Sequence, residues 1–116
     1  MNQPGPELDA KLAKALGKPN VRKFNYRYVW DNVGYVNGKH VGAVMGTVDV
    51  PEYSTTWSGM QLVVEEMQRR NWWIVLNNEG DKWSALFYWN PNAEAFEGES
   101  DTAPHAVALA AKAALE

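Results

Sequence analysis

The sequence predicts an α+β fold in which an antiparallel β-sheet carries helices on both faces, an α/β/α sandwich. Three observations indicate this class: helical apolar spacing in three segments, alternating or continuous apolar runs between them, and turn-forming residues such as Asn37-Gly38 between the runs. At 116 residues the chain is long enough to build one domain with its own core. We expect a disordered lead over residues 1–6 and a single domain over residues 7–116.

Three segments have the sequence pattern of helices. Residues 7–16 place a leucine at every fourth position, and the following Gly17 supplies a C-terminal stop. A second helix begins after the hydroxyl side chains of residues 54–56, any of which can cap it. A third helix, rich in alanine, begins after Asp101 or Thr102. Its small side chains allow another backbone to approach closely, either from the sheet or from a neighbouring subunit.

The segments between these helices predict strands. Residues 21–30 alternate strictly, which predicts one strand with aromatic rings on one side, and residues 21–48 as a whole predict an extended β-hairpin. Residues 72–76 are continuously apolar, and residues 82–89 are apolar on both sides, so we expect both strands to be covered by layers on each face. Residues 93–100 carry three glutamates, which is typical of an edge strand.

Composition limits the classes of function. The net charge of −3 argues against duplex nucleic acid, whose binding requires a basic surface. No apolar run approaches the roughly 18 residues of a membrane span, and no secretory signal is evident, so we expect no membrane partner. The chain has no cysteine, and its two histidines lie far apart in the sequence. We therefore expect no metal site, and nothing in the sequence indicates a cofactor.

The stretch FNYRYVW, residues 24–30, raises the main functional question. An aromatic ring stands at every second position, with Arg22, Lys23 and Arg27 beside the rings. In one interpretation the rings form a core face beneath a helix. In the other the hairpin projects, the rings stack a flat ligand, and the cations bind its phosphate groups.

A second anion site is expected at the start of the middle helix, where free N–H groups and the positive end of the dipole attract phosphate. The adjacent hydroxyls fit capping as well as binding, and both interpretations stay open. His40, just after the hairpin turn, can also meet an anion. The residues expected to bind the ligand are Arg22, Lys23, Tyr26, Arg27, Tyr28, Trp30, His40, Tyr53, Ser54, Thr55 and Thr56.

Residues 50–115 resemble the phage ABA sandwich domain family, a group of small proteins of phages and prophages. The resemblance rests on three stretches: the helix start VPEYSTTWSGMQLVVEEM, the strand segments WIVL and SALFYW, and the C-terminal AEAFEGESDTAPHAVALAAKAAL. It implies helices on both faces of an antiparallel sheet, a phage origin and a location in the host bacterial cytoplasm. Residues 21–48 extend beyond this pattern as an inserted or lengthened hairpin.

Together these features predict a non-enzymatic phage protein that binds and sequesters a small anionic ligand, with a cyclic nucleotide signal of host anti-phage defence as the candidate. An alternative is a protein–protein interaction module that inhibits a host protein or assists phage assembly, because exposed Trp and Tyr are hot-spot residues. A third is a hydrolase, although the sequence shows neither a metal cluster nor a catalytic triad. The last helix and the hairpin also predict surfaces for a homo-oligomer.

Overall fold

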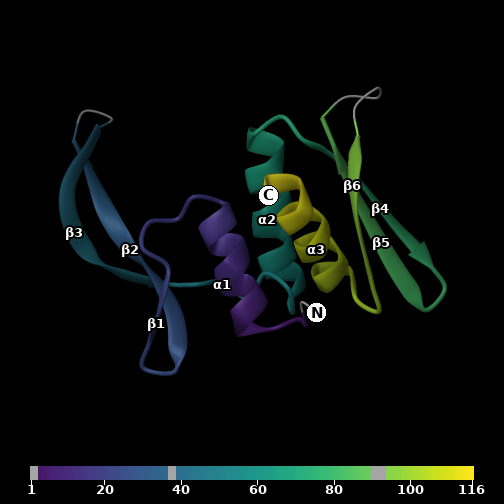
Figure 1. Ribbon diagram of the computed structural model, residues 1–116, viewed down its shortest axis with the longest axis horizontal. Helices are drawn as coiled ribbons and strands as arrows, with labels where there is room; N and C mark the ends of the chain where they lie inside the picture. The colour runs from purple at the N-terminus through teal and green to yellow at the C-terminus, as the bar shows by residue number, and fades with distance from the viewer. Residues whose placement is uncertain (1–2, 37–38, 90–93) are drawn as a thin grey trace.

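The computed structural model describes residues 3–36, 39–89 and 94–116, with side chains described outside residues 33–36 and 39–45. Within these residues the chain forms three helices and two three-stranded antiparallel sheets (Figure 1), which confirms the α+β class. The helices are α1 (Pro6–Ala15), α2 (Trp57–Arg69) and α3 (Ala103–Leu115). The strands are β1 (Arg22–Phe24), β2 (Arg27–Val36), β3 (Lys39–Asp49), β4 (Trp73–Glu79), β5 (Lys82–Tyr88) and β6 (Ala95–Ser100).

The helices lie between the two sheets (Figure 1). One sheet has the strand order β1-β2-β3 and the other β4-β5-β6. α3 packs on β5 and β6 and beside α2, whereas α1 packs on α3 and on β2. α1 therefore separates the first sheet from the rest of the molecule. This layer order differs from the predicted one, in which helices cover both faces of a single sheet, because the extended hairpin forms a separate sheet.

Two hairpins make up the first sheet. β2 pairs with β3 as far as Val36 and Lys39, which flank the predicted Asn37-Gly38 turn; the two turn residues lie outside the described residues. β1 pairs with β2 as far as Phe24 and Arg27. The aromatic stretch therefore contains a turn of its own.

That turn consists of Asn25 and Tyr26, whose φ angles are +48° and +68°. A two-residue hairpin turn of type I′ requires positive φ at both central positions. The prediction of one continuous strand over residues 21–30 is wrong, because the alternation of ring and polar side chains continues through the two turn residues. As a result, the rings on the two sides of the turn belong to different strands.

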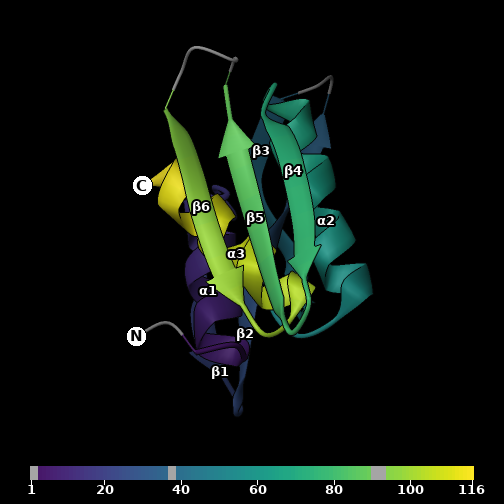
Figure 2. The same ribbon diagram turned by 90° about the vertical axis from the view of Figure 1, so that its right-hand side faces the viewer.

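The second sheet has one covered and one uncovered face. Ala85 and Phe87 of β5 point into the core and are fully buried. Because side chains alternate along a strand, the neighbouring Leu86 and Tyr88 lie on the opposite face. No helix of the described chain packs on that face (Figure 2). The prediction that β4 and β5 are covered on both faces is therefore wrong for the described structure, because α2 and α3 lie on the same side of this sheet.

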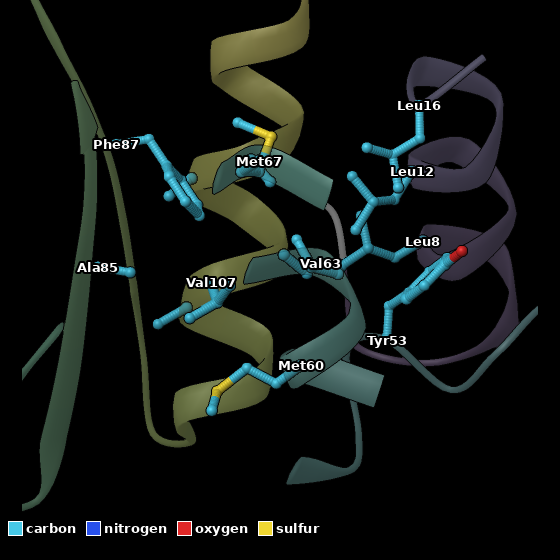
Figure 3. Packing of buried hydrophobic residues seen from close by; sticks show 14 of the residues in the cluster. Leu8, Leu12, Leu16, Tyr53, Met60, Val63, Met67, Ala85, Phe87 and Val107 are labelled. Atoms are coloured by element: carbon cyan, nitrogen blue, oxygen red, sulfur yellow. The ribbon is translucent and has the colours of Figure 1, made fainter. Parts of the chain in front are cut away.

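The core is formed where the three helices and the second sheet meet (Figure 3). Leu8, Leu12 and Leu16 are buried and point from α1 toward α2 and α3. A leucine at every fourth position predicts that one side of the helix faces the core, and the structure confirms this prediction. Val63 and Met67 of α2 lie between these leucines and the sheet, and both are fully buried.

The ends of the helices follow capping rules. α1 begins at Pro6, and the N–H of Gly5 donates to Ser54 Oγ at 2.9 Å, so the predicted disordered lead is wrong for these two residues. Thr56 caps α2 by accepting a hydrogen bond from the Gly59 N–H, and Thr102 caps α3 in the same way. Each of these threonines was one of the alternatives allowed by the sequence.

Candidate functional site

A concave surface lies between α1 and the β1–β2 hairpin. Its first hollow has a volume of about 430 Å³, and adjoining hollows of about 220 and 250 Å³ lie on either side. Tyr28 lines all three, and Tyr26 lines two of them. We name this surface the α1–hairpin groove. The residues lining its first hollow are Gln3, Pro4, Gly5, Pro6, Glu7, Leu8, Lys11, Lys23, Tyr26 and Tyr28.

The four predicted rings have different surroundings. Tyr26 is 99% exposed at the tip of the hairpin, and Tyr28 is partly buried in the groove. Phe24 is 48% exposed but does not line the described hollows of the groove. Trp30 packs against the core, with Lys18 Nζ 5.3 Å from its ring centroid. The predicted ring platform is therefore reduced to the two tyrosines.

The backbone conformation of Tyr26 is costly for this residue. A positive φ costs a non-glycine residue roughly 1–2 kcal/mol, and glycine is preferred at this position of the turn. Because Tyr26 is almost completely exposed, packing within the chain does not compensate for this cost. Strain of this kind at an exposed aromatic residue favours a role in binding.

The three predicted phosphate-binding cations separate into two groups. Arg22 donates to Asp31 Oδ1 at 2.8 Å, and Arg27 Nε lies 3.1 Å from Asp49 Oδ1. Both guanidinium groups therefore already hold a carboxylate of the first sheet. Lys23 is exposed and lines the groove.

Two lysines that sequence analysis did not single out also line the groove. Lys11 and Lys14 lie on the side of α1 opposite the buried leucines, so their spacing from Glu7 along the helix was the available signal. On this side of Tyr26 and Tyr28 the charged side chains that line the groove are three lysines, Lys11, Lys14 and Lys23, and one glutamate, Glu7. On the other side the third hollow is lined by Asp49 and Glu52 in addition to Arg27. The groove therefore has a basic and an acidic end.

The predicted anion site at the start of α2 is occupied by contacts within the chain. Tyr53 is 2% exposed and Ser54 is fully buried. The Ser54 N–H donates to Asp9 Oδ1 at 2.8 Å, and its hydroxyl accepts from Gly5. Thr56 is the N-cap, and Thr55 is exposed. None of these four residues lines the described hollows of the groove.

The side chain of His40 lies outside the described residues. The other histidine, His105, has its Nδ1 2.7 Å from Ser100 Oγ at the start of α3. This is a hydroxyl–imidazole contact of the kind that nucleophilic catalysis uses. Neither Ser100 nor His105 lines the described hollows of the groove. The side chain of Thr102, the N-cap of α3, accepts a hydrogen bond from the backbone N–H of His105. The pair is explained by the geometry of the helix start.

The described residues also bear on two other functional classes, metal-binding and membrane-spanning proteins. Within them, no group of three or more His, Cys, Asp or Glu side chains is arranged to hold a metal ion. No helix among them has the length and apolar character required to cross a membrane.

Two carboxyl groups, those of Asp9 and Asp31, are expected to change stability in opposite directions on acidification. Burial raises the pKa of Asp9, despite the hydrogen bonds from Ser54. The folded state therefore binds this proton more tightly than the unfolded state does, and the contribution of Asp9 to stability increases as the pH falls. Hydrogen bonds from Asn20 and Arg22 lower the pKa of Asp31, so its contribution is present above its ordinary pKa and is lost as the pH falls through the folded value.

Urea unfolding between about pH 7 and pH 3 measures both effects. Asp9→Asn keeps an oxygen for the Ser54 N–H but cannot take up the proton. We expect it to remove the stabilisation on acidification, and so to steepen the loss of stability as the pH falls toward about 4, the ordinary Asp pKa. We expect Asp31→Asn to reduce the loss of stability below about pH 4. Identical pH profiles for Asp9→Asn and the wild type would contradict the assigned burial of Asp9.

The comparisons with known proteins do not add a family. No protein-family model matches the chain, and no curated protein matches it. The resemblance to the phage ABA sandwich domain family therefore stays a prediction from residues 50–115.

Proposed function

We propose that this chain is a non-enzymatic binding protein that holds a small anionic ligand with a flat ring in the α1–hairpin groove. The observation that carries this proposal is the position of Tyr26, an exposed ring on a costly turn above a hollow that Lys11 and Lys23 line. A nucleotide has the matching chemistry. Its base stacks on Tyr26 and Tyr28, and its phosphate faces the lysines.

The charges at the two ends of the groove favour a particular orientation of the nucleotide. The phosphate lies toward Lys11, Lys14 and Lys23, and an amino group of the base lies toward the acidic end at Asp49 and Glu52. Stacking contributes roughly 1–3 kcal/mol per base. A ligand with two bases, such as a cyclic dinucleotide, therefore gains more stacking free energy from the two tyrosines than a mononucleotide does.

The biological setting of the proposal rests on the family resemblance. A phage protein that holds a cyclic nucleotide in the host bacterial cytoplasm would sequester this signal from the host's anti-phage defence. Sequestration requires tight binding without turnover. This setting adds no contact to the site, and the ligand-binding proposal can be tested without it.

Isothermal titration against a panel of mononucleotides and cyclic di- and trinucleotides tests the proposal. We expect at least one cyclic nucleotide to bind with a Kd below about 10 µM. Tyr26→Gly is expected to weaken this binding by about tenfold or more, because one stacking contact is lost. The same change places Gly after Asn25 in the turn and is expected to raise stability by about 1 kcal/mol, so that loss of binding would not reflect unfolding.

Phe24→Ala is the matched control, since Phe24 lies on the same hairpin but outside the described hollows of the groove. We expect this variant to bind as the wild type does. Failure of all panel members to bind below about 10 µM would reject the proposal. Recovery of cleaved nucleotide after prolonged incubation would instead favour the hydrolase.

A protein–protein interaction module that inhibits a host protein or assists phage assembly is the second candidate. The uncovered face of β4, β5 and β6 favours it, because it carries the exposed Trp73 and the partly buried Tyr88, and Trp and Tyr are typical of interface hot spots. A specific partner that remains bound after nuclease treatment and dialysis would support this candidate. Self-association stays a prediction, which light scattering can test. One of its two expected surfaces, α3, is largely buried within the chain.

A further inference from the structure

One face of the second sheet points away from the helices (Figure 2), and apolar side chains of β4 and β5 lie on it. Trp73 is paired with Tyr88, and Val75 with Leu86, so these four side chains form two adjacent rows. We name this patch the outer face. Trp73 is 54% exposed, and its ring lies edge-on to Tyr88 with 5.6 Å between centroids. A hollow of about 490 Å³ continues from Trp73 and Tyr88 around the edge of β4.

Acidic side chains border the outer face on one side. Glu97 of β6 is paired with Leu86, and Glu99 is paired with Ser84. At the far end of the same face, Glu79 is paired with Lys82, whose Nζ lies 3.6 Å from Asp101. A partner that covers the apolar patch therefore meets negative charge along β6.

We propose that the outer face docks an amphipathic helix of another protein, apolar on one side and carrying Lys or Arg on the flank that lies over β6. Three strands span about 14 Å, and a seven-residue strand is about 23 Å long. A helix is about 10–12 Å wide, and about 15 residues give it the same length. One helix therefore matches the face in size, and it would complete the layer that the apolar pattern of β4 and β5 predicts.

A second copy of this chain fits the outer face less well. Face-to-face packing of two copies brings two acidic borders to one interface, and like charges there cost free energy. The described helices also direct most of their apolar side chains into the core, and only two large ones, Trp57 and Leu62 of α2, are exposed on them. Charge complementarity therefore favours a different, basic partner. This inference is independent of ligand binding in the α1–hairpin groove.

A designed helical peptide of about 15 residues, with Leu along one side and Lys along both flanks, is the probe. A matched peptide carries Glu in place of Lys. We expect the Lys peptide to bind with a Kd of about 1–100 µM, the range of small transient interfaces, and binding to weaken as salt rises. Anisotropy of the labelled peptides measures both Kd values.

Three variants locate the binding. Trp73→Ala and the double change Glu97→Gln/Glu99→Gln are each expected to weaken binding of the Lys peptide by about fivefold or more. Trp57→Ala is the matched control, because Trp57 is 57% exposed but lies on α2. It is expected to change the Kd by less than about twofold. Circular dichroism establishes that each variant keeps its fold.

Four results would overturn the proposal. They are equal binding of the Glu peptide, an equal loss of binding in Trp57→Ala, no binding of the Lys peptide at about 100 µM, and a dimer in sedimentation that Trp73→Ala disperses. The last result would assign the outer face to a second copy of this chain.

Discussion

Replacing Tyr53 with alanine is expected to lower the free energy of unfolding by about 3–5 kcal/mol, as is typical when a large buried ring is removed. Tyr53 is 2% exposed and packs in the same cluster as Leu8 and Leu12 (Figure 3). Burial also raises the pKa of its hydroxyl well above the ordinary value, so the side chain stays neutral. Urea unfolding monitored by far-UV circular dichroism measures the loss.

Tyr53→Phe is the matched control, because it keeps the ring and removes only the hydroxyl. We expect it to cost about 1 kcal/mol or less. If Tyr53→Ala left stability unchanged but abolished nucleotide binding, Tyr53 would belong to the ligand site that the sequence predicted. Tyr26 is expected to show the opposite behaviour, because it is exposed and lines the groove.

The difference between these two tyrosines shows where sequence analysis reached its limit. Both follow turn-forming residues, and nothing in their neighbours distinguishes a buried ring from an exposed one. The difference comes from contacts across the sequence: Asp9 accepts from the Ser54 N–H, and Ser54 accepts from Gly5, which holds this segment against the start of α1. Contacts between residues more than 40 positions apart leave no local pattern.

Local patterns did predict the elements that depend on them. The leucine spacing identified the buried side of α1, and hydroxyl residues marked the starts of α2 and α3. The layer order could not be predicted in this way. Apolar side chains on both sides of β5 indicate that both faces favour burial, but not whether the same chain or a partner covers the second face. The turn at Asn25 and Tyr26 was missed because tyrosine is rare at positive φ.

The groove was predicted in part. Lys23, Tyr26 and Tyr28 were expected to bind an anion and do line one hollow. Arg22 and Arg27 were also expected there. Arg27 does line the third hollow with both tyrosines, but it pairs with Asp49, whereas Arg22 pairs with Asp31 and lines none of the three hollows. Lys11 was missed because its helix was interpreted only through its leucines.

Replacing Gly98 with alanine is expected to lower the free energy of unfolding by about 3 kcal/mol, the upper end of the usual cost of overpacking. Gly98 lies on β6 directly beneath α3. A Cβ atom added there would lie 2.2 Å from the carbonyl oxygen of Ala106 and 2.6 Å from the backbone nitrogen of Ala110. Neither backbone atom can rotate away as the end of a side chain does, so the whole helix or the strand must shift.

Gly80→Ala separates this steric effect from a general effect of replacing glycine. Gly80 lies in the β4–β5 turn at φ +76°, and an added Cβ there meets no atom within 4 Å. Its replacement is expected to cost about 1 kcal/mol through backbone strain alone. Equal losses for the two variants, measured by urea unfolding, would contradict the close approach of α3 to β6.

The close approach of α3 to Gly98 also explains why this helix is rich in alanine. Ala106 and Ala110 are fully buried, and they face a strand whose own side chain is absent at Gly98. Small residues on both elements allow the backbones to approach, so a larger residue on either one should have a similar cost. We therefore expect Ala110→Leu to destabilise the fold about as much as Gly98→Ala. Because both changes disrupt one contact, the double variant should lose less stability than the two single losses combined.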